Sequence, residues 1–163
     1  MSRFFNLYLS RPRSGDDPGQ DFIEAALPAA VAGSRMRWWP PGGPVVARGT
    51  RVLIGVGSYC LYDLRLLDVV DEALAHHPPP APRVDVFSTL ACQTAADFAR
   101  YIPNLPPLYH TPVVGIWQDG RLIEADEGYA ARDRLARMFG SSSDEIVAFV
   151  QDFLDSGAAA PAT

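Results

Sequence analysis

The stretch from Thr111 to Ala125 constrains the fold of this chain more than any other part. Pro112 to Trp117 is an apolar run, Gln118-Asp119-Gly120 follows it, and Arg121 to Ala125 returns with strand-forming residues. Asp-Gly between two such runs is a favoured sequence for a tight β-hairpin turn. The stretch therefore predicts two antiparallel strands that are entered through a proline.

Four further segments have the composition of strands. Val52 to Val56 is continuously apolar, which is typical of a central strand buried on both faces. Val84 to Phe87 and Arg35 to Trp39 are shorter candidates. In Arg3 to Leu9 the apolar residues alternate and aromatic side chains are frequent, so a strand is predicted there as well.

Apolar residues at helical spacing predict five helices. They cover 22–31, 61–76, 89–101, 129–139 and a last segment that opens at Ser143-Asp144-Glu145. Pro28 lies inside the first of them, so that helix is expected to be short, kinked or broken, and Gly33 is a natural stop. In the helix over 61–76, Asp68, Asp71 and Glu72 are assigned to the polar side.

The order of these elements predicts an α/β protein with a mixed sheet covered by helices on both faces. A chain of 163 residues with 48% hydrophobic and 20% charged residues fits one domain with one substantial core. We assign residues 1–157 to that domain, with its first strand and helix as an N-terminal extension, and residues 158–163 to a flexible tail.

Composition excludes several classes of function. The net charge is -5 and no basic cluster occurs, which argues against non-specific nucleic-acid binding. The chain has no lysine, so Schiff-base and P-loop lysine chemistry are excluded. No apolar run reaches the ~20 residues of a membrane span, and no signal peptide is recognisable, so a cytoplasmic location is expected. No motif calls for a cofactor, and the two cysteines, Cys60 and Cys92, lack the spacing of a metal site.

From Val52 to Leu154, about two thirds of the chain, this order resembles the thioredoxin superfamily. The segment from Ser58 to Asp63 is similar to the family's Trp-Cys-x-x-Cys turn, and His110-Thr111-Pro112 is similar to its cis-proline entry to the hairpin. Asp144 to Leu154 is similar to its closing helix. The resemblance implies a thioredoxin-like α/β fold, a cis peptide bond before Pro112, and a backbone edge at Thr111 that docks extended peptides.

The chain departs from the family at the second cysteine position, which Asp63 occupies. A dithiol cycle needs a resolving thiol there, and a carboxylate cannot resolve a mixed disulfide. The carboxylate should also raise the pKa of Cys60, whereas a position near a helix N-terminus should lower it, so the reactivity of Cys60 stays open. Cys92 is expected to be a buried structural residue rather than a resolving partner.

Three functions follow as alternatives. The first is a redox-inactive thioredoxin-like protein that acts in binding, assembly or chaperoning, by analogy with redox-silent members of the superfamily that serve metalloenzyme maturation. Its partner is expected to be a protein, and a homo-oligomer stays open. The second is a monothiol redox enzyme that uses Cys60. The third is a subunit of a larger assembly, with Trp38 and Trp39 either as an exposed contact patch or as a cap on the core.

The candidate site residues lie in three regions of the chain. The candidate face consists of residues 58–63 with Thr111 and Pro112, and His110 should border it. The full set of candidate site residues is Trp38, Trp39, Ser58, Tyr59, Cys60, Tyr62, Asp63, His110, Thr111 and Pro112.

Overall fold

The computed structural model describes residues 2–12, 20–39, 48–103 and 110–157. The tail predicted at 158–163 lies outside them. The elements in chain order are α1 (Phe5–Ser10), α2 (Gln20–Ala32), β1 (Arg37–Trp38), β2 (Thr50–Val56), α3 (Leu61–His76), β3 (Arg83–Ser88), the 3-10 helix η1 (Thr89–Ala91), α4 (Ala95–Ala99), β4 (Val113–Gln118), β5 (Arg121–Glu127), α5 (Gly128–Met138) and α6 (Ser143–Asp155).

The strands form one five-stranded sheet in the order β1-β3-β2-β4-β5. β1, β3 and β2 run parallel to one another, β4 is antiparallel to β2, and β5 is antiparallel to β4. β2 is the middle strand, and its residues from Arg51 to Val56 are all buried. The predicted α/β class, the mixed sheet and the central position of the apolar run are therefore confirmed.

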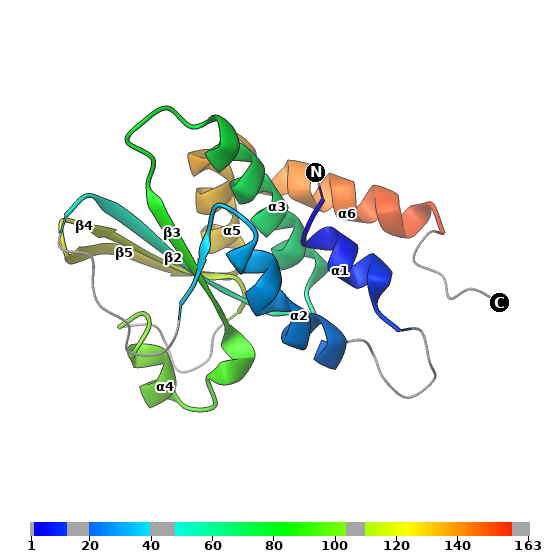
Figure 1. The fold of residues 1–163 in the computed structure, drawn as a ribbon, viewed down its shortest axis with the longest axis horizontal. Coiled ribbons are helices and arrows are strands. Elements are labelled where there is room, and N and C mark those ends of the chain that lie inside the picture. Colours follow the sequence, from blue (N-terminus) through cyan, green and yellow to red (C-terminus); the bar gives the residue numbers. More distant parts are fainter. Residues whose placement is uncertain (1, 13–19, 40–47, 104–109, 158–163) are drawn as a thin grey trace.

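Helices cover both faces of this sheet (Figure 1). On one face α2, α3, α5 and α6 pack into a large apolar core, whereas α4 lies apart from them over the other face. Adjacent residues of β2 divide between the two cores, with Ile54 in the first and Leu53 in the second. A strand buried on both faces requires this alternation, because successive side chains point in opposite directions.

The strand predicted for Arg3 to Leu9 is wrong, since this segment forms the short helix α1. Its first amides are held by a side chain from far along the chain: Asp68 accepts hydrogen bonds from the N–H of Phe4 at 2.8 Å and of Phe5 at 3.0 Å. The ring of Phe5 then packs edge-on against Phe149 of α6, at 5.2 Å between centroids. Tertiary contacts thus override the local strand preference.

Asp68 was assigned to the polar side of its helix, and that assignment is wrong as well. The residue is 1% exposed and lies beneath α1 rather than in solvent. A carboxylate is tolerated there because both of its oxygens accept a backbone N–H. The helix itself is confirmed with the predicted bounds, Leu61–His76.

Two other helices differ from their predictions. α2 continues through Pro28 for 13 residues, because Leu27 and Val31 are fully buried and their packing outweighs the backbone hydrogen bond that proline removes. The helix predicted over 89–101 is instead broken into η1 and the five residues of α4. Thr94 restarts it with a capping box in which its side chain and that of Asp97 each accept the other's backbone N–H.

The hairpin and the last helix follow the prediction closely. Asp119 and Gly120 have φ of 50° and 81°, as a turn of two left-handed residues requires. α6 begins at Ser143, and the side chain that caps it belongs to Ser142, whose hydroxyl accepts the N–H of Glu145. The peptide bond between Thr111 and Pro112 is cis, as the resemblance implied.

Candidate functional site

The first half of the candidate face is the turn between β2 and α3. The N–H of Cys60 donates to the carbonyl of Gly57 at 2.9 Å, which closes the turn, and α3 begins at Leu61. Gly57 in turn donates its N–H to the Oδ2 of Asp63 at 2.9 Å. The side chain of Asp63 therefore folds back beneath the turn instead of pointing outward.

The second half is the loop that enters β4, and the start of α5 holds it in place. The N–H of Gly128 lies within hydrogen-bond distance of two carbonyls, those of His110 at 3.0 Å and Pro112 at 2.9 Å. Gly128 has a φ of +61°, and a Cβ there would lie 3.2 Å from the Cβ of His110. A side chain at this position would be strained, so the sequence needs glycine to bring α5 against the proline loop.

Asp63 joins the two halves of the face. It is fully buried, and burial raises its pKa to about 6. The N–H of Gly57, the hydroxyl of Thr111 and the thiol of Cys60 hold the pKa down, as does the positive charge of Arg132. The structure thus places the hydroxyl of Thr111 and the thiol of Cys60 beside the carboxyl group of Asp63.

Cys60 is half-buried. The effects that raise the pKa of its thiol outweigh those that lower it. Burial and the negative charge of Asp63 raise its pKa to about 11, although hydrogen bonds from the backbone N–H groups of Asp63 and Tyr62 lower it. The favourable helix terminus is therefore present but is outweighed. Near neutral pH the group is a thiol, which is a poor nucleophile.

Cys92 lies in the core on the α4 side of the sheet and is 7% exposed. Burial, with a smaller effect from Asp97, raises its pKa to about 11. Both cysteines are free thiols. The interpretation of Cys92 as a buried structural residue is confirmed.

The remaining residues of the candidate face differ in exposure. Tyr59 is 57% exposed and His110 is exposed, whereas Pro112 is buried. Tyr62 is half-buried, and its hydroxyl accepts a hydrogen bond from Gln151 of α6 at 2.7 Å. Tyr59 is therefore the large apolar side chain that the turn presents to solvent.

Ser58 is fully buried. Its hydroxyl oxygen has no hydrogen-bond partner within the described ranges. The turn that joins β2 to α3 thus places the Ser58 side chain beneath the candidate face, and its role in binding stays a prediction.

The two tryptophans lie elsewhere and do not form an exposed patch. Trp39 is 5% exposed and packs in the α4-side core, with the guanidinium of Arg51 at 3.8 Å from its ring centroid. Arg51 is itself buried and forms an ion pair with the buried Asp85, with 2.9 Å between Nε and Oδ2. Trp38 is half-buried against the first core. Of the two interpretations, the cap on the core is confirmed and the contact patch is wrong.

Arg132 of α5 acts on this site, although it was not among the candidate residues. It is half-buried, its Nε donates to the hydroxyl of Ser143 at 2.7 Å, and its guanidinium lies 5.2 Å from the ring centroid of Tyr62. It brings positive charge to Asp63 from α5. No local sequence pattern marks it, because its approach to Asp63 depends on how α5 packs against α3.

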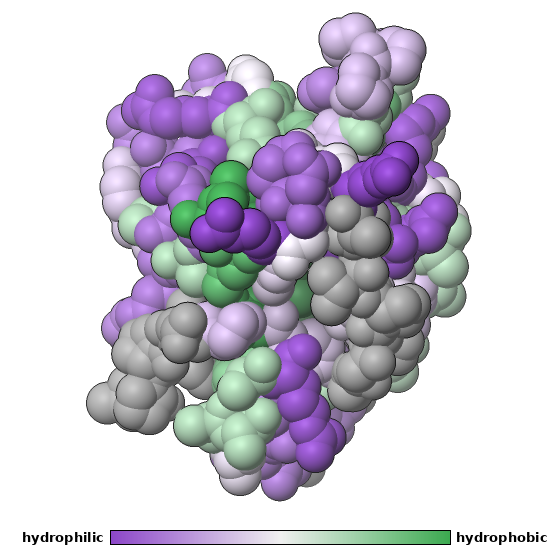
Figure 2. Space-filling model, turned by 90° about the vertical axis from the view of Figure 1, so that its left-hand side faces the viewer, coloured by the Kyte–Doolittle hydropathy of each residue, from purple (hydrophilic) through white to green (hydrophobic). Residues whose placement is uncertain are grey.

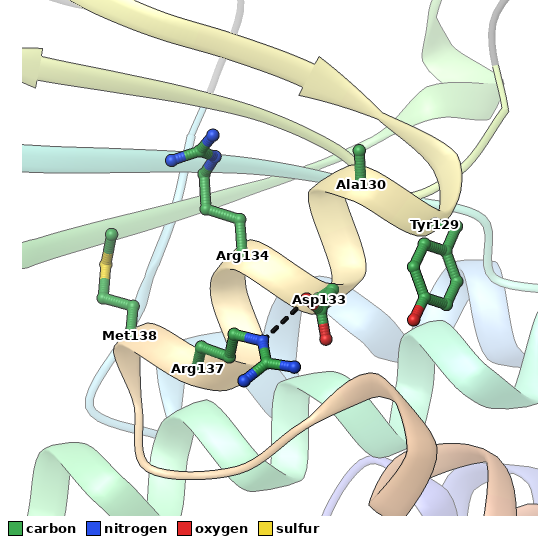
Figure 3. A pocket seen from close by; sticks show the side chains of 6 residues that line it. All are labelled: Tyr129, Ala130, Asp133, Arg134, Arg137 and Met138. Carbon is green, nitrogen blue, oxygen red and sulfur yellow. Dashed lines mark hydrogen bonds and ion pairs between the residues drawn. The ribbon is translucent and has the colours of Figure 1, made fainter.

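A hollow lies on the surface of α5, away from the candidate face (Figure 3). Its lining residues, Tyr129, Ala130, Asp133, Arg134, Arg137 and Met138, all belong to this one helix. Arg137 donates to Asp133 at 2.7 Å, and Arg134 forms ion pairs with two carboxylates of β5. The charged side chains that line the hollow are thus paired with neighbouring opposite charges. The hollow is a groove on a helix surface rather than an enclosed site.

The side of the molecule that carries the β4–β5 hairpin is mixed in character (Figure 2). Apolar atoms gather there in small patches that hydrophilic side chains separate, and Ile123, 57% exposed, belongs to β5. Interspersed charge is a common way to protect an edge strand such as β5 from pairing with another chain. This view therefore gives no broad apolar surface for a partner.

Within the described ranges, none of the helices has both the length and the apolar character needed to cross a membrane. The same residues contain no cluster of three or more His, Cys, Asp or Glu side chains that could hold a metal ion. No protein-family model matches the chain, and a search of curated proteins finds no match. An assignment of function therefore depends on the geometry of the site.

Proposed function

We propose that this chain is a redox-inactive protein of the thioredoxin-like type that binds other proteins through the candidate face. Three features support the thioredoxin-like part of the proposal. The mixed sheet ends in an antiparallel hairpin, the hairpin is entered through a cis bond at Thr111-Pro112, and Cys60 stands between the central strand and its helix.

The observation that carries the proposal is the buried carboxyl of Asp63 beside Cys60. A dithiol enzyme needs a low-pKa attacking thiolate and a second thiol that resolves the mixed disulfide. Here the pKa of the first thiol is raised to about 11, and a carboxyl occupies the second position. The site has kept the architecture around the proline loop but lacks the chemistry of a disulfide exchanger.

Tyr59 supports a binding role for the same face. Its side chain is exposed, yet its ring lies against the backbone of the turn: a Cβ on Gly57 would meet the ring at 2.9 Å. An aromatic ring that is already held in place loses little conformational entropy when a partner covers it. Tyrosine is among the residues that most often contribute large binding energies at protein interfaces.

Binding tests this proposal directly. A photo-cross-linking residue at position 59 would identify the partner in host cells, and the affinity of the purified pair would then be measured by calorimetry. Tyr59→Ala should weaken binding at least ~10-fold, equivalent to about 1.4 kcal/mol. Ile123→Ala is a matched control, because both residues are 57% exposed and Ile123 lies on the edge strand β5. Equal effects of the two substitutions would contradict a specific role for the face.

A monothiol enzyme is the second candidate, and one observation favours it. The backbone N–H groups of Tyr62 and Asp63 hydrogen-bond to the sulfur of the half-exposed Cys60 and lower its pKa. This function requires a thiolate near neutral pH, which burial and the charge of Asp63 oppose. The pH dependence of thiol alkylation separates the two candidates.

A further inference from the structure

The side chain of Asp63 lies between the two parts of the candidate face, the turn at Gly57 and the loop at Thr111. Its Oδ2 accepts the N–H of Gly57 at 2.9 Å. The hydroxyl of Thr111 and the thiol of Cys60 also interact with the carboxyl and lower its pKa. Its Oδ1 makes no hydrogen bond of regular geometry within the described ranges, so these two contacts are looser than the one from Gly57.

Cys60 and Arg132 act on this carboxyl, and one imidazole lies next to Thr111 in the sequence. The thiol of Cys60 faces it from the start of its own helix, the guanidinium of Arg132 acts on it from α5, and the exposed His110 precedes Thr111 in the proline loop. With this balance the pKa of Asp63 is about 6. The carboxyl therefore changes its protonation state under mildly acidic conditions while it stays out of solvent.

We propose that Asp63 is a positioning residue that fastens the Thr111 loop to the Gly57 turn when it is ionised, and that it rearranges this connection when it takes up a proton. The ionised carboxylate accepts hydrogen bonds from N–H, O–H and S–H donors alike. The protonated acid carries a donor of its own. When the proton resides on the oxygen that Thr111 contacts, the Thr111 hydroxyl turns round and accepts a hydrogen bond, or loses the contact.

This inference rests on the proposed function for its meaning, because it concerns the control of the same face. Protonation would alter the relative placement of Thr111 and Tyr59, which a partner would contact together. Partner binding through the candidate face would then depend on pH, although the side chain of Asp63 is buried and does not itself contact the partner.

Amide chemical shifts of the free protein test it, followed by nuclear magnetic resonance from about pH 4.5 to pH 8. The amides of Gly57 and Thr111 should share one transition near pH 6. Asp63→Asn should abolish the transition at both amides. His110→Gln should preserve it, which excludes the neighbouring imidazole as the source of the transition. The proposal is overturned if the wild type shows no shared transition, or if Asp63→Asn retains it.

A second pair of variants keeps the test decisive even if Asp63→Asn folds poorly. Thr111→Val removes the hydroxyl and keeps the shape, so the Thr111 amide should lose the transition while the Gly57 amide keeps it. Thr111→Ser should restore the shared behaviour. An unchanged response in Thr111→Val would overturn the fastening role. No partner is present in these measurements, so their failure leaves the binding proposal standing, and a failure of the Tyr59→Ala binding test leaves these results unaffected.

Discussion

Two buried carboxyls close together on α3, Asp63 and Asp68, perform similar tasks for two different segments of the chain. Each lies out of solvent, each connects α3 to a segment distant in sequence, and burial raises the pKa of each to about 6. Asp68 holds the N-terminal helix α1, and Asp63 holds the Thr111 loop. One helix thus organises both the N-terminal segment and the candidate face.

The difference lies in how their oxygens are used. Both oxygens of Asp68 accept backbone amides, at 2.8 and 3.0 Å, and a backbone amide can only donate. Asp63 accepts one amide with regular geometry, and its other contacts are to a hydroxyl and a thiol, which can donate or accept. Asp68 is therefore a fixed structural anchor, whereas the surroundings of Asp63 can respond to a proton.

The largest expected effect is the loss of the anchor. Asp68→Ala leaves the buried N–H groups of Phe4 and Phe5 without an acceptor, which should lower the free energy of unfolding by about 2–4 kcal/mol. Urea denaturation measures this. Asp63→Ala is the matched comparison and should lower it by about 1–2 kcal/mol, because only Gly57 loses a regular hydrogen bond. Equal losses in the two variants would break the distinction between the carboxyls.

The second prediction concerns pH. The pKa of each carboxyl is raised from 3.8 to about 6 in the folded state, so between these values the folded protein binds more protons than the unfolded chain. Their stabilising contribution is full below about pH 4 and is lost as the pH rises through about 6. The free energy of unfolding should therefore be about 1–3 kcal/mol lower at about pH 7.5 than at about pH 5.

Urea denaturation at the two pH values checks this prediction. Asp63→Asn and Asp68→Asn should each remove part of the difference, because the amide does not titrate. A wild-type protein equally stable at both values would show that solvent reaches these groups and relieves the effect of burial.

The two regions also differ in what the sequence could predict. The central strand, the bounds of α3 and the Asp119-Gly120 turn follow from local composition and spacing, and all are confirmed. α1 depends on hydrogen bonds between Asp68 and amides 63 and 64 positions away. A local pattern holds no information about such contacts, so both α1 and the burial of Asp68 were predicted wrongly.

The candidate site shows the same limit. The resemblance pointed to the segments around Cys60 and Thr111, and it raised the question of what a carboxyl at position 63 does to the thiol. It could not supply the burial of Asp63 or the approach of Arg132, because both depend on how α5 packs against α3. The competing effects on Cys60 were identified from sequence, but their balance required the structure.

The third prediction concerns the pKa of the Cys60 thiol, on which the two carboxyls should have different effects. Iodoacetamide alkylation, measured in a Cys92→Ala background, should report an apparent pKa well above the usual ~8.5 of a thiol. Asp63→Asn removes the neighbouring charge and should lower that pKa by about one unit, a ~10-fold gain in thiolate at a fixed pH below it. Asp68→Asn should leave it unchanged. An apparent pKa below ~8.5 in the wild type would instead support the monothiol enzyme.

The smallest effect is expected at Asp71, a third carboxylate on the same helix. It accepts the N–H of Arg35 at 2.9 Å and pairs with the Nε of Arg3 at 3.7 Å, so it too connects α3 to a segment outside the helix. Its side chain is 14% exposed and that of Arg3 is 35% exposed, so water screens the pair. Asp71→Asn keeps an acceptor oxygen and should change the free energy of unfolding by no more than about 0.5 kcal/mol. If urea denaturation showed a loss as large as that of Asp68→Ala, the number of contacts rather than their burial would set the strength of these connections.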